Sequence, residues 1–386
     1  MGGQAFNQLT ADGKSVITTP RLPPEIYARL KQRVMDILND HFRECICPHE
    51  APDKADHGDI DILVSEDGDK HSITDMALWL GAELTIDRGD SYSFALPYTA
   101  SDGTVTHAQV DVHPCGDNLR WLAFMQSYGD IWQILGVSIR GFGFTATDRG
   151  LHVRLPQVEK KDWKASMIFL GKEPHAVMQF LGLDSDTYTK GFTTEHQIFE
   201  WISEARLFSK DAFLDRIETS GDRRRMRSRG MFNRFVNEYI PTLPSSSRNE
   251  PHQEREALLA EAIRIFGKED EYSSKASRAA KQQDEETARD RIHSILRATG
   301  MTHDKVNMTI RGFKRWTVYD GTILRIRDAP EMNDDDQIEL GHLLAPQGDT
   351  LRADMHEWVL SNHEEIKTRE KRRTKDAKVA RSQQRG

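Results

Sequence analysis

The sequence predicts an α+β protein, in which a mixed sheet with helices on one face is followed by a mostly helical C-terminal region. Two observations favour this fold class. A helix-type pattern over 24–38 precedes three β-like stretches that end by residue 114, and helix-type patterns then dominate from 209 to 300. At 386 residues the chain is long enough for two or more domains.

The composition is typical of a soluble protein from the interior of the cell. Three cysteines are too few for a disulfide framework, and residues 1–13 lack the apolar core of a signal peptide. No apolar run approaches the roughly 18 residues that a membrane span needs. We therefore expect an intracellular protein without a membrane partner, and a basic tail at 367–386 adds the nucleus to the cytoplasm as a candidate compartment.

The charge is unevenly distributed. The net charge is -8, but residues 367–386 carry nine basic and two acidic residues, so the rest of the chain is strongly acidic. An acidic body with basic segments suits local contact with a polyanion rather than bulk coating of DNA.

The first half of the chain gives clear element predictions. Residues 1–19 are polar and patternless, which predicts a flexible arm. Apolar residues recur at helical spacing over 24–38 behind a proline pair, which predicts an amphipathic helix. The predicted strands are 59–64, 91–98 and 107–114, with a helix over 72–82 between the first two.

The second half is less uniform. A helical pattern over 119–141 and a β-like stretch over 143–155 are followed by 155–190, where no pattern dominates. A capped helix is predicted over 193–208. The remaining expected regions are a mostly helical 213–310 cut by a Pro- and Ser-rich linker at 241–251, a mixed 311–366 and the basic tail 367–386.

Two carboxylates stand in an otherwise apolar strand pattern. Residues two apart in a strand share a face, so Asp59 and Asp61 are expected side by side. Like charges this close repel unless a cation lies between them, and oxygen ligands favour Mg²⁺ or Mn²⁺. Gly58 before them would let a bulky ligand approach the backbone.

A third carboxylate, Asp111, lies in the strand pattern of 107–114. If the two strands are neighbours, the three aspartates converge and can hold two metal ions for in-line phosphoryl transfer, with Asp111 closest to the nucleophile. The alternative is structural, because an Asp-x-Asp pair is also common at strand ends and in turns.

These motifs resemble, in order, those of the DNA polymerase β-like nucleotidyltransferases, and within them the palm and nucleotide-binding subdomains of the family X DNA polymerases. The resemblance implies a palm over 20–118 and a nucleotide-binding subdomain over 119–212 with an insertion near 155–190. The similar stretches are the helix at 21–38, Gly58–Val64, the strand at 110–114, Ser127–Thr145 and Thr193–Ile202.

The resemblance implies a metal-dependent transfer of a nucleoside monophosphate from an NTP or dNTP to a hydroxyl group. Asp59 and Asp61 would bind both metal ions, and Asp111 would bind the metal ion of the nucleophile. The residues implied to contact the sugar and base of the nucleoside triphosphate are Ser127, Tyr128, Gly129, Asp130 and Gln133.

One departure from the family concerns the triphosphate. The family's Gly-Ser pair is replaced by Pro48 and His49, and the loop from there to Gly58 holds no arginine. Positive charge is therefore expected from Lys54, His57 or His49, although a histidine is only partly charged at pH 7.

An arginine-rich segment at 221–235 indicates a nucleic-acid acceptor, such as a 3′-hydroxyl. Arginine suits phosphate, and the interleaved Phe232 and Phe235 can stack on unpaired bases. A solvated helix face is the alternative. The candidate contacts are Arg223, Arg224, Arg225, Arg227 and Arg229.

Three other interpretations stay open. The chain could be a catalytically degenerate fold that binds nucleic acid or protein, which the altered loop favours, or it could transfer to a small-molecule or protein hydroxyl. His41, Cys45, Cys47 and His49 are zinc-ligand types within nine residues, but they lack the usual two-residue spacers.

Overall fold

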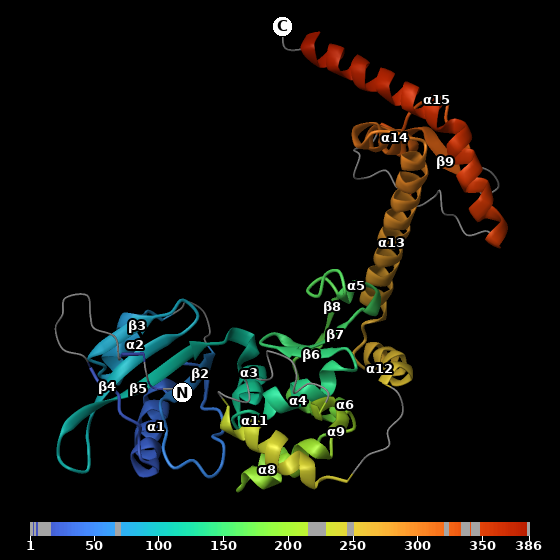
Figure 1. Ribbon diagram of the computed structural model, residues 1–386. Coiled ribbons are helices and arrows are strands. Elements are labelled where there is room, and N and C mark those ends of the chain that lie inside the picture. Colours follow the sequence, from blue (N-terminus) through green and yellow to red (C-terminus); the bar gives the residue numbers. More distant parts are fainter. Residues whose placement is uncertain are drawn as a thin grey trace. The chain divides into compact units, whose positions relative to one another are not determined.

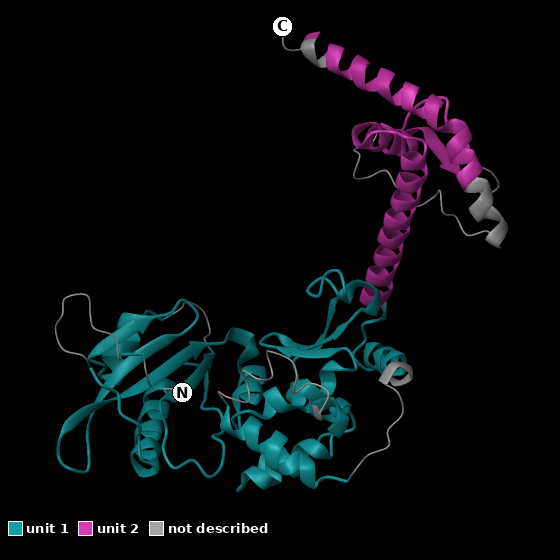
Figure 2. Cartoon of the chain, viewed as in Figure 1, with its two compact units in different colours: residues 1–269 teal, residues 270–386 magenta. Residues whose placement is uncertain are grey.

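The computed structural model describes most of the chain and divides it into two compact units, residues 1–269 and 270–386 (Figure 2). The predicted α+β class with a helical C-terminal region is confirmed. The described residues are 3, 5–6, 17–65, 71–214, 229–244, 251–319, 324–332, 340 and 348–383.

Unit 1 begins with a five-stranded sheet in the order β1-β2-β5-β4-β3 (Figure 1). The β2 and β5 strands run parallel and the other neighbours run antiparallel, so the sheet is mixed as predicted. The predicted strands at 59–64, 91–98 and 107–114 are confirmed. The strand bounds are β1 Glu44–Ile46, β2 Ile60–Ser65, β3 Leu84–Asp87, β4 Tyr92–Thr99 and β5 Val105–Pro114.

One face of this sheet packs against two helices, α1 (Pro24–Asn39) and α2 (Ile73–Leu80). Ile60 and Ile62 of β2 point into this core and are fully buried, together with Val34 of α1. The α2 helix begins where the Ser72 hydroxyl accepts a hydrogen bond from the Asp75 N–H, and it ends at Gly81 in the left-handed region. Both predicted helices are therefore confirmed.

The opposite face of the sheet is only partly covered. Leu63 points to this face and packs against Leu119 and Ala123 of α3 (Leu119–Gln126). Because side chains alternate along a strand, Asp61 and Asp59 share the face of Leu63, but they precede it in the chain. The start of β2 thus presents its polar side chains beside α3, and the Asp61 side chain is 45% exposed.

The predicted helix over 119–141 is two helices, α3 and α4 (Ile131–Arg140), separated by a turn at 127–130. The β-like stretch over 143–155 forms β6 and β7, which pair with β8 in a second sheet, so the patternless 155–190 contributes a strand to it. The remaining elements of unit 1 are β6 Phe144–Thr147, β7 Gly150–Arg154, α5 Pro156–Glu159, β8 Met167–Gly171, α6 Pro174–Leu181, α7 Ser185–Lys190, α8 Glu195–Ser203, α9 Lys210–Leu214, α11 Gly230–Arg234, the π-helical turn η2 Phe235–Tyr239, the 3₁₀ turns η1 Gly116–Asn118 and η3 Ile240–Thr242, and α12 Pro251–Ile265.

Unit 2 is mostly helical. The α13 (Glu269–Ala298), α14 (His303–Trp316) and α15 (Gly348–Gln383) helices pack around a core that includes Ile292, Phe313 and Ile366. Two short antiparallel strands, β9 (Thr317–Tyr319) and β10 (Leu324–Ile326), follow α14. Among the described helices of both units, none is long and apolar enough to cross a membrane.

Candidate active site

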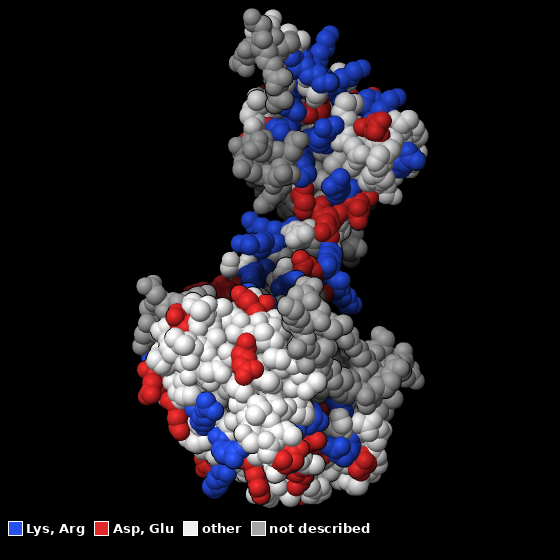
Figure 3. Space-filling model, turned by 90° about the vertical axis from the view of Figure 1, so that its left-hand side faces the viewer, with Lys and Arg blue, Asp and Glu red and all other residues white. Residues whose placement is uncertain are grey.

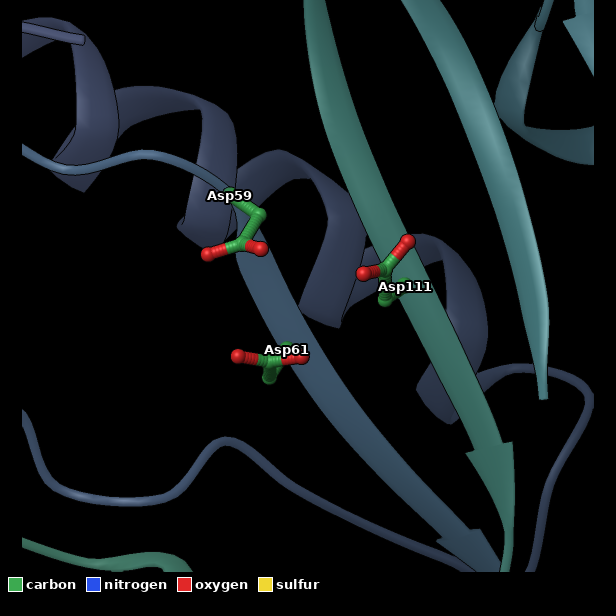
Figure 4. A group of neighbouring side chains, drawn as sticks. All are labelled: Asp59, Asp61 and Asp111. Atoms are coloured by element: carbon green, nitrogen blue, oxygen red, sulfur yellow. The ribbon is translucent and has the colours of Figure 1, made fainter. Parts of the chain in front are cut away.

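The three predicted aspartates meet on the partly covered face of the first sheet (Figure 4). Asp61 of β2 lies directly opposite Asp111 of β5 in the parallel pair, and Asp59 immediately precedes β2. One carboxylate oxygen from each residue lies within 4.8 Å of the others. The expectation that these strands are neighbours is confirmed, and the neighbouring strands bring together carboxylates about fifty residues apart in sequence.

Burial and neighbouring charges raise the pKa of two of these carboxyl groups, Asp59 and Asp111. Burial, together with the charges of Asp61 and Asp111, raises the pKa of Asp59 to about 6. Burial also raises the pKa of Asp111, and the neighbouring charge of Asp61 acts in the same direction. The repulsion is electrostatic, so a bound divalent cation would relieve it.

The oxygens at this site fit a metal ion. The Oδ2 atom of Asp111 accepts a hydrogen bond from the Gln109 side-chain amide at 2.8 Å. Its Oδ1 atom is buried and has no hydrogen-bond partner among the described residues, which is costly unless a cation or ligand contacts it. A set of carboxylate oxygens suits a hard cation such as Mg²⁺ or Mn²⁺, although the set alone does not distinguish between them.

A histidine adjoins the cluster. The Nε2 atom of His113 lies 3.3 Å from Oδ1 of Asp61, because His113 follows Asp111 by two residues and shares its face. Burial lowers the pKa of His113, but the hydrogen bond to Asp61 and the surrounding carboxylates outweigh it, so the pKa is raised overall. The raised pKa favours the protonated, positively charged form of this ring next to Asp61.

His57 and Lys54, from which positive charge is expected, both have partners within the protein, and triphosphate contact by Lys54 stays a prediction. His57 is 8% exposed, and its ring stacks on Tyr27 with 3.8 Å between ring centroids. Burial lowers the pKa of His57, so its ring is mostly neutral at pH 7 and cannot supply the expected charge. Lys54 forms an ion pair with Glu50, which also accepts a hydrogen bond from the Tyr27 hydroxyl.

His49, which stands in place of the family's Gly-Ser pair, joins two parts of unit 1. Its backbone N–H donates to the Ser127 hydroxyl at 3.0 Å, and its carbonyl accepts from the Tyr128 N–H at 2.6 Å. The His49 and Tyr128 rings stack in parallel. Burial lowers the pKa of His49, so the ring is a poor source of charge for a triphosphate.

The turn at 127–130, between α3 and α4, is tightly packed. Tyr128 has a φ of 57°, and the following Gly129 has a φ of 69°. A β-carbon at Gly129 would lie 3.2 Å from the Ala51 methyl group, so glycine is favoured there by both its backbone conformation and the available space. Ser127 and Tyr128 are buried, whereas the half-buried Gln133 shows no side-chain hydrogen bond to any described residue. Nucleotide contact by the residues of this turn and by Gln133 stays a prediction.

Asp130 has partners within the protein. One of its carboxylate oxygens accepts from Arg229 at 2.8 Å and the other from the Phe232 N–H at 3.3 Å, so it holds the start of α11. The sequence predicted nucleotide contact for Asp130 and nucleic-acid contact for Arg229, and the structure pairs the two residues with each other. The other arginines of that group, Arg223, Arg224, Arg225 and Arg227, lie outside the described residues.

Replacement of Asp130 with alanine is expected to destabilise the protein by about 1–3 kcal/mol, because it leaves the buried Phe232 N–H and the partly exposed Arg229 guanidinium without their acceptor. Gln133→Ala on the neighbouring helix serves as the control and should leave stability unchanged within about 0.5 kcal/mol. Chemical denaturation followed by circular dichroism measures both. An Asp130→Ala protein as stable as the wild type would contradict a structural role for Asp130.

The zinc interpretation finds no support among the described residues. His41 stacks on Trp79, and His49 stacks on Tyr128, so the two rings have separate partners. Cys45 and Cys47 pack against the hydrophobic core of the first sheet. The aspartate cluster is the one group of potential metal ligands in the described part of the chain.

Three residues at the site were missed by sequence reasoning. Gln109 is two residues before Asp111, so the period of a strand could have placed it on the same face. Arg88 donates to the Ser93 hydroxyl at 3.0 Å, and Ser93 lies opposite Asp111 in the β4–β5 pair. Gly3 donates its N–H to Asp59, a contact that no local sequence signal could reveal.

The contact of Gly3 falls within the flexible arm predicted over 1–19, of which the structure describes residues 3, 5–6 and 17–19. Phe6 in that stretch is 5% exposed, and the Thr19 side chain donates a hydrogen bond to the Gly3 carbonyl. These described residues have partners within unit 1, and flexibility of the rest of 1–19 stays a prediction.

No protein-family model and no curated protein matches the sequence. Two solved structures of Leishmania infantum polymerase β are similar to part of it, one a ternary gap complex and the other a ternary P/T complex. Each shares 13% identity over 43% of this chain, with a TM-score of 0.32. The alignments cover 68% and 74% of those chains. At such low similarity, any assignment of function depends on the residues of this chain.

Proposed function

We propose that the protein is a nucleotidyltransferase that moves a nucleoside monophosphate from a nucleoside triphosphate to a hydroxyl group. The observation that carries the proposal is the register of β2 and β5, which sets Asp61 opposite Asp111 with Asp59 alongside. The buried and unpartnered Oδ1 of Asp111 supports it, because a carboxylate oxygen is rarely left so unless it has a ligand.

Each residue of the cluster has a role in this proposal. Asp59 and Asp61 would hold two Mg²⁺ or Mn²⁺ ions, and Asp111 would hold the ion on the acceptor side. When bound, such ions neutralise phosphate charge and lower the pKa of the attacking hydroxyl. Arg88, which reaches the same face through Ser93, would add positive charge for the triphosphate in place of the buried His57.

A nucleic-acid 3′-hydroxyl is the proposed acceptor. Five basic residues and one acidic residue occupy 371–380 of α15. Basic side chains gather on the face of unit 2 drawn in Figure 3. Four of those on α15 are exposed and form no ion pair with any described residue, which leaves them available for phosphate groups. These four are Lys371, Arg372, Lys375 and Lys378.

Replacement of these four residues with glutamine is expected to weaken binding of a single-stranded oligonucleotide. Because each phosphate contact releases counterions, the slope of log K against log salt concentration should become shallower by about 3. Fluorescence anisotropy at several salt concentrations measures the slope. The control replaces four exposed basic residues elsewhere, Arg29, Arg33, Arg278 and Arg289, and an equal loss in that variant would contradict a specific role for α15.

The reaction itself is tested by incubating the protein with Mg²⁺ or Mn²⁺, α-labelled triphosphates, and DNA and RNA oligonucleotides with free 3′-hydroxyls. We expect label on an oligonucleotide and release of pyrophosphate. Label on the protein or on an added small alcohol instead would keep the chemistry and reject the nucleic-acid acceptor. A protein that binds oligonucleotides but never releases pyrophosphate would be a binding module.

A further inference from the structure

The described residues near the start of the chain lie against the aspartate cluster. The Gly3 N–H donates to Oδ2 of Asp59 at 3.0 Å, although 56 positions separate the two residues. The Ala5 N–H donates to the Gln109 side-chain oxygen at 2.9 Å, and the Gln109 amide donates in turn to Oδ2 of Asp111. Two of the three carboxylates are thus connected to the same short segment.

We propose that Gly3 and Ala5 are positioning residues that orient two aspartates for divalent cations. Gly3 orients Asp59 directly, and Ala5 orients Asp111 through Gln109. This inference rests on the proposed function and extends it to a part of the chain that carries no catalytic side chain. Such outer hydrogen bonds fix the direction of metal ligands and raise metal affinity.

The choice of carboxylate oxygens that accept these hydrogen bonds indicates that the segment orients the aspartates and does not block the cation site. On both Asp59 and Asp111, the segment and Gln109 use Oδ2. The Oδ1 atom of Asp111 is left without a partner among the described residues, and no described hydrogen bond uses Oδ1 of Asp59. Each carboxylate therefore keeps one oxygen for a cation while the other is fixed.

Position 3 accepts only glycine. Its φ is 81°, and a β-carbon there would lie 2.1 Å from the carbonyl oxygen of Gly58, the residue that precedes Asp59. The obstacle is backbone, so a larger residue would have to move the segment away from the aspartates. Two further contacts hold the segment in place, the hydrogen bond from the Thr19 hydroxyl to the Gly3 carbonyl at 2.7 Å and the burial of Phe6.

The test is a titration of Mn²⁺ into the full-length protein, with bound metal measured by electron paramagnetic resonance. Gly3→Ala is expected to weaken Mn²⁺ binding about 10- to 100-fold. Gly103→Ala is the matched control, because Gly103 has a φ of 82° but a β-carbon there would meet no atom within 4 Å. Both variants carry the same backbone strain, and only Gly3→Ala must shift the segment.

A second pair of variants separates positioning from general stability. Thr19→Val removes the hydrogen bond to Gly3 with little change of shape, whereas Thr19→Ser keeps it. We expect weaker Mn²⁺ binding in Thr19→Val and restored binding in Thr19→Ser, with similar thermal unfolding in both. If all variants that fold bind Mn²⁺ with equal affinity, then these residues affect only the stability of the fold. That result would overturn the proposal.

Tighter Mn²⁺ binding in Gly3→Ala would also overturn the proposal, because the segment would then compete with the cation.

Failure of the proposed function gives a different set of results. If the wild type binds no Mn²⁺, or if Asp61→Asn binds it as well as the wild type, then the aspartate cluster is not a metal site. If Mn²⁺ binding requires Asp61 but is unchanged in Gly3→Ala, only the positioning role is rejected.

Discussion

Asp61→Asn is expected to lower the rate of nucleotidyl transfer by roughly a thousandfold or more, because it removes a charged ligand shared by both proposed metal ions. Asp111→Asn should have a comparable effect. The fold should persist, since loss of one carboxylate relieves repulsion within the cluster. The measurement is pyrophosphate release with saturating triphosphate and Mg²⁺, with circular dichroism to verify folding.

The matched control for these variants is Asp36→Asn, which removes an exposed carboxylate from α1 on the other face of the sheet. It should retain wild-type activity. Full activity in the folded Asp61→Asn protein would contradict the assignment of the cluster as the catalytic centre.

Divalent cations are expected to stabilise the protein in a pH-dependent manner. Ligand at a hundred times its dissociation constant adds about 2.7 kcal/mol, which corresponds to a rise of about 5–10 °C in the melting temperature for a unit of this size. Since the pKa of Asp59 is raised to about 6, this carboxyl group takes up a proton below that pH and competes with the metal ion. The rise should therefore be large at pH 8 and small at pH 5.

In the absence of a metal ion, a rise in pH lowers the stability of the protein through Asp59. A carboxyl group whose pKa is raised in the folded state destabilises the protein when it is ionised, so its unfavourable contribution grows as the pH rises through about 6. Asp59→Asn should increase the stability of metal-free protein at pH 8 by about 1–2 kcal/mol, allowing for partial exposure, and by about half as much at pH 5, where the carboxyl group of the unfolded chain is already ionised. Calorimetry at both pH values measures this. A variant less stable than the wild type at pH 8 would contradict the repulsion.

The sequence predicted the fold where its elements were long or strongly patterned. The helix at α1 and the strands β2, β4 and β5 follow from apolar periodicity alone. The β1 strand has three residues, too few to show alternation, and the β3 strand alternates over only four residues. The strand β8 was missed because 155–190 has no dominant period, and its place is set by pairing with β7.

The candidate site was predicted in part. The period of a strand placed Asp59 and Asp61 together, but the approach of Asp111 needed the pairing of β2 with β5, which a single sequence can only suggest. Burial overrides residue type at His57, because the sequence offers this ring as a cation and burial beside Tyr27 lowers its pKa. The contact of Gly3 with Asp59 depends on tertiary structure alone.

The decisive measurement is a calorimetric titration of nucleoside triphosphates with Mg²⁺ into wild type and the Asp61→Asn/Asp111→Asn variant. We predict binding of at least one of the ATP, GTP, CTP and UTP set or their deoxy counterparts, and this binding should require the metal ion and disappear in the variant. Absence of binding for every triphosphate, or equal binding by the variant, would contradict a nucleotidyltransferase centre at these aspartates.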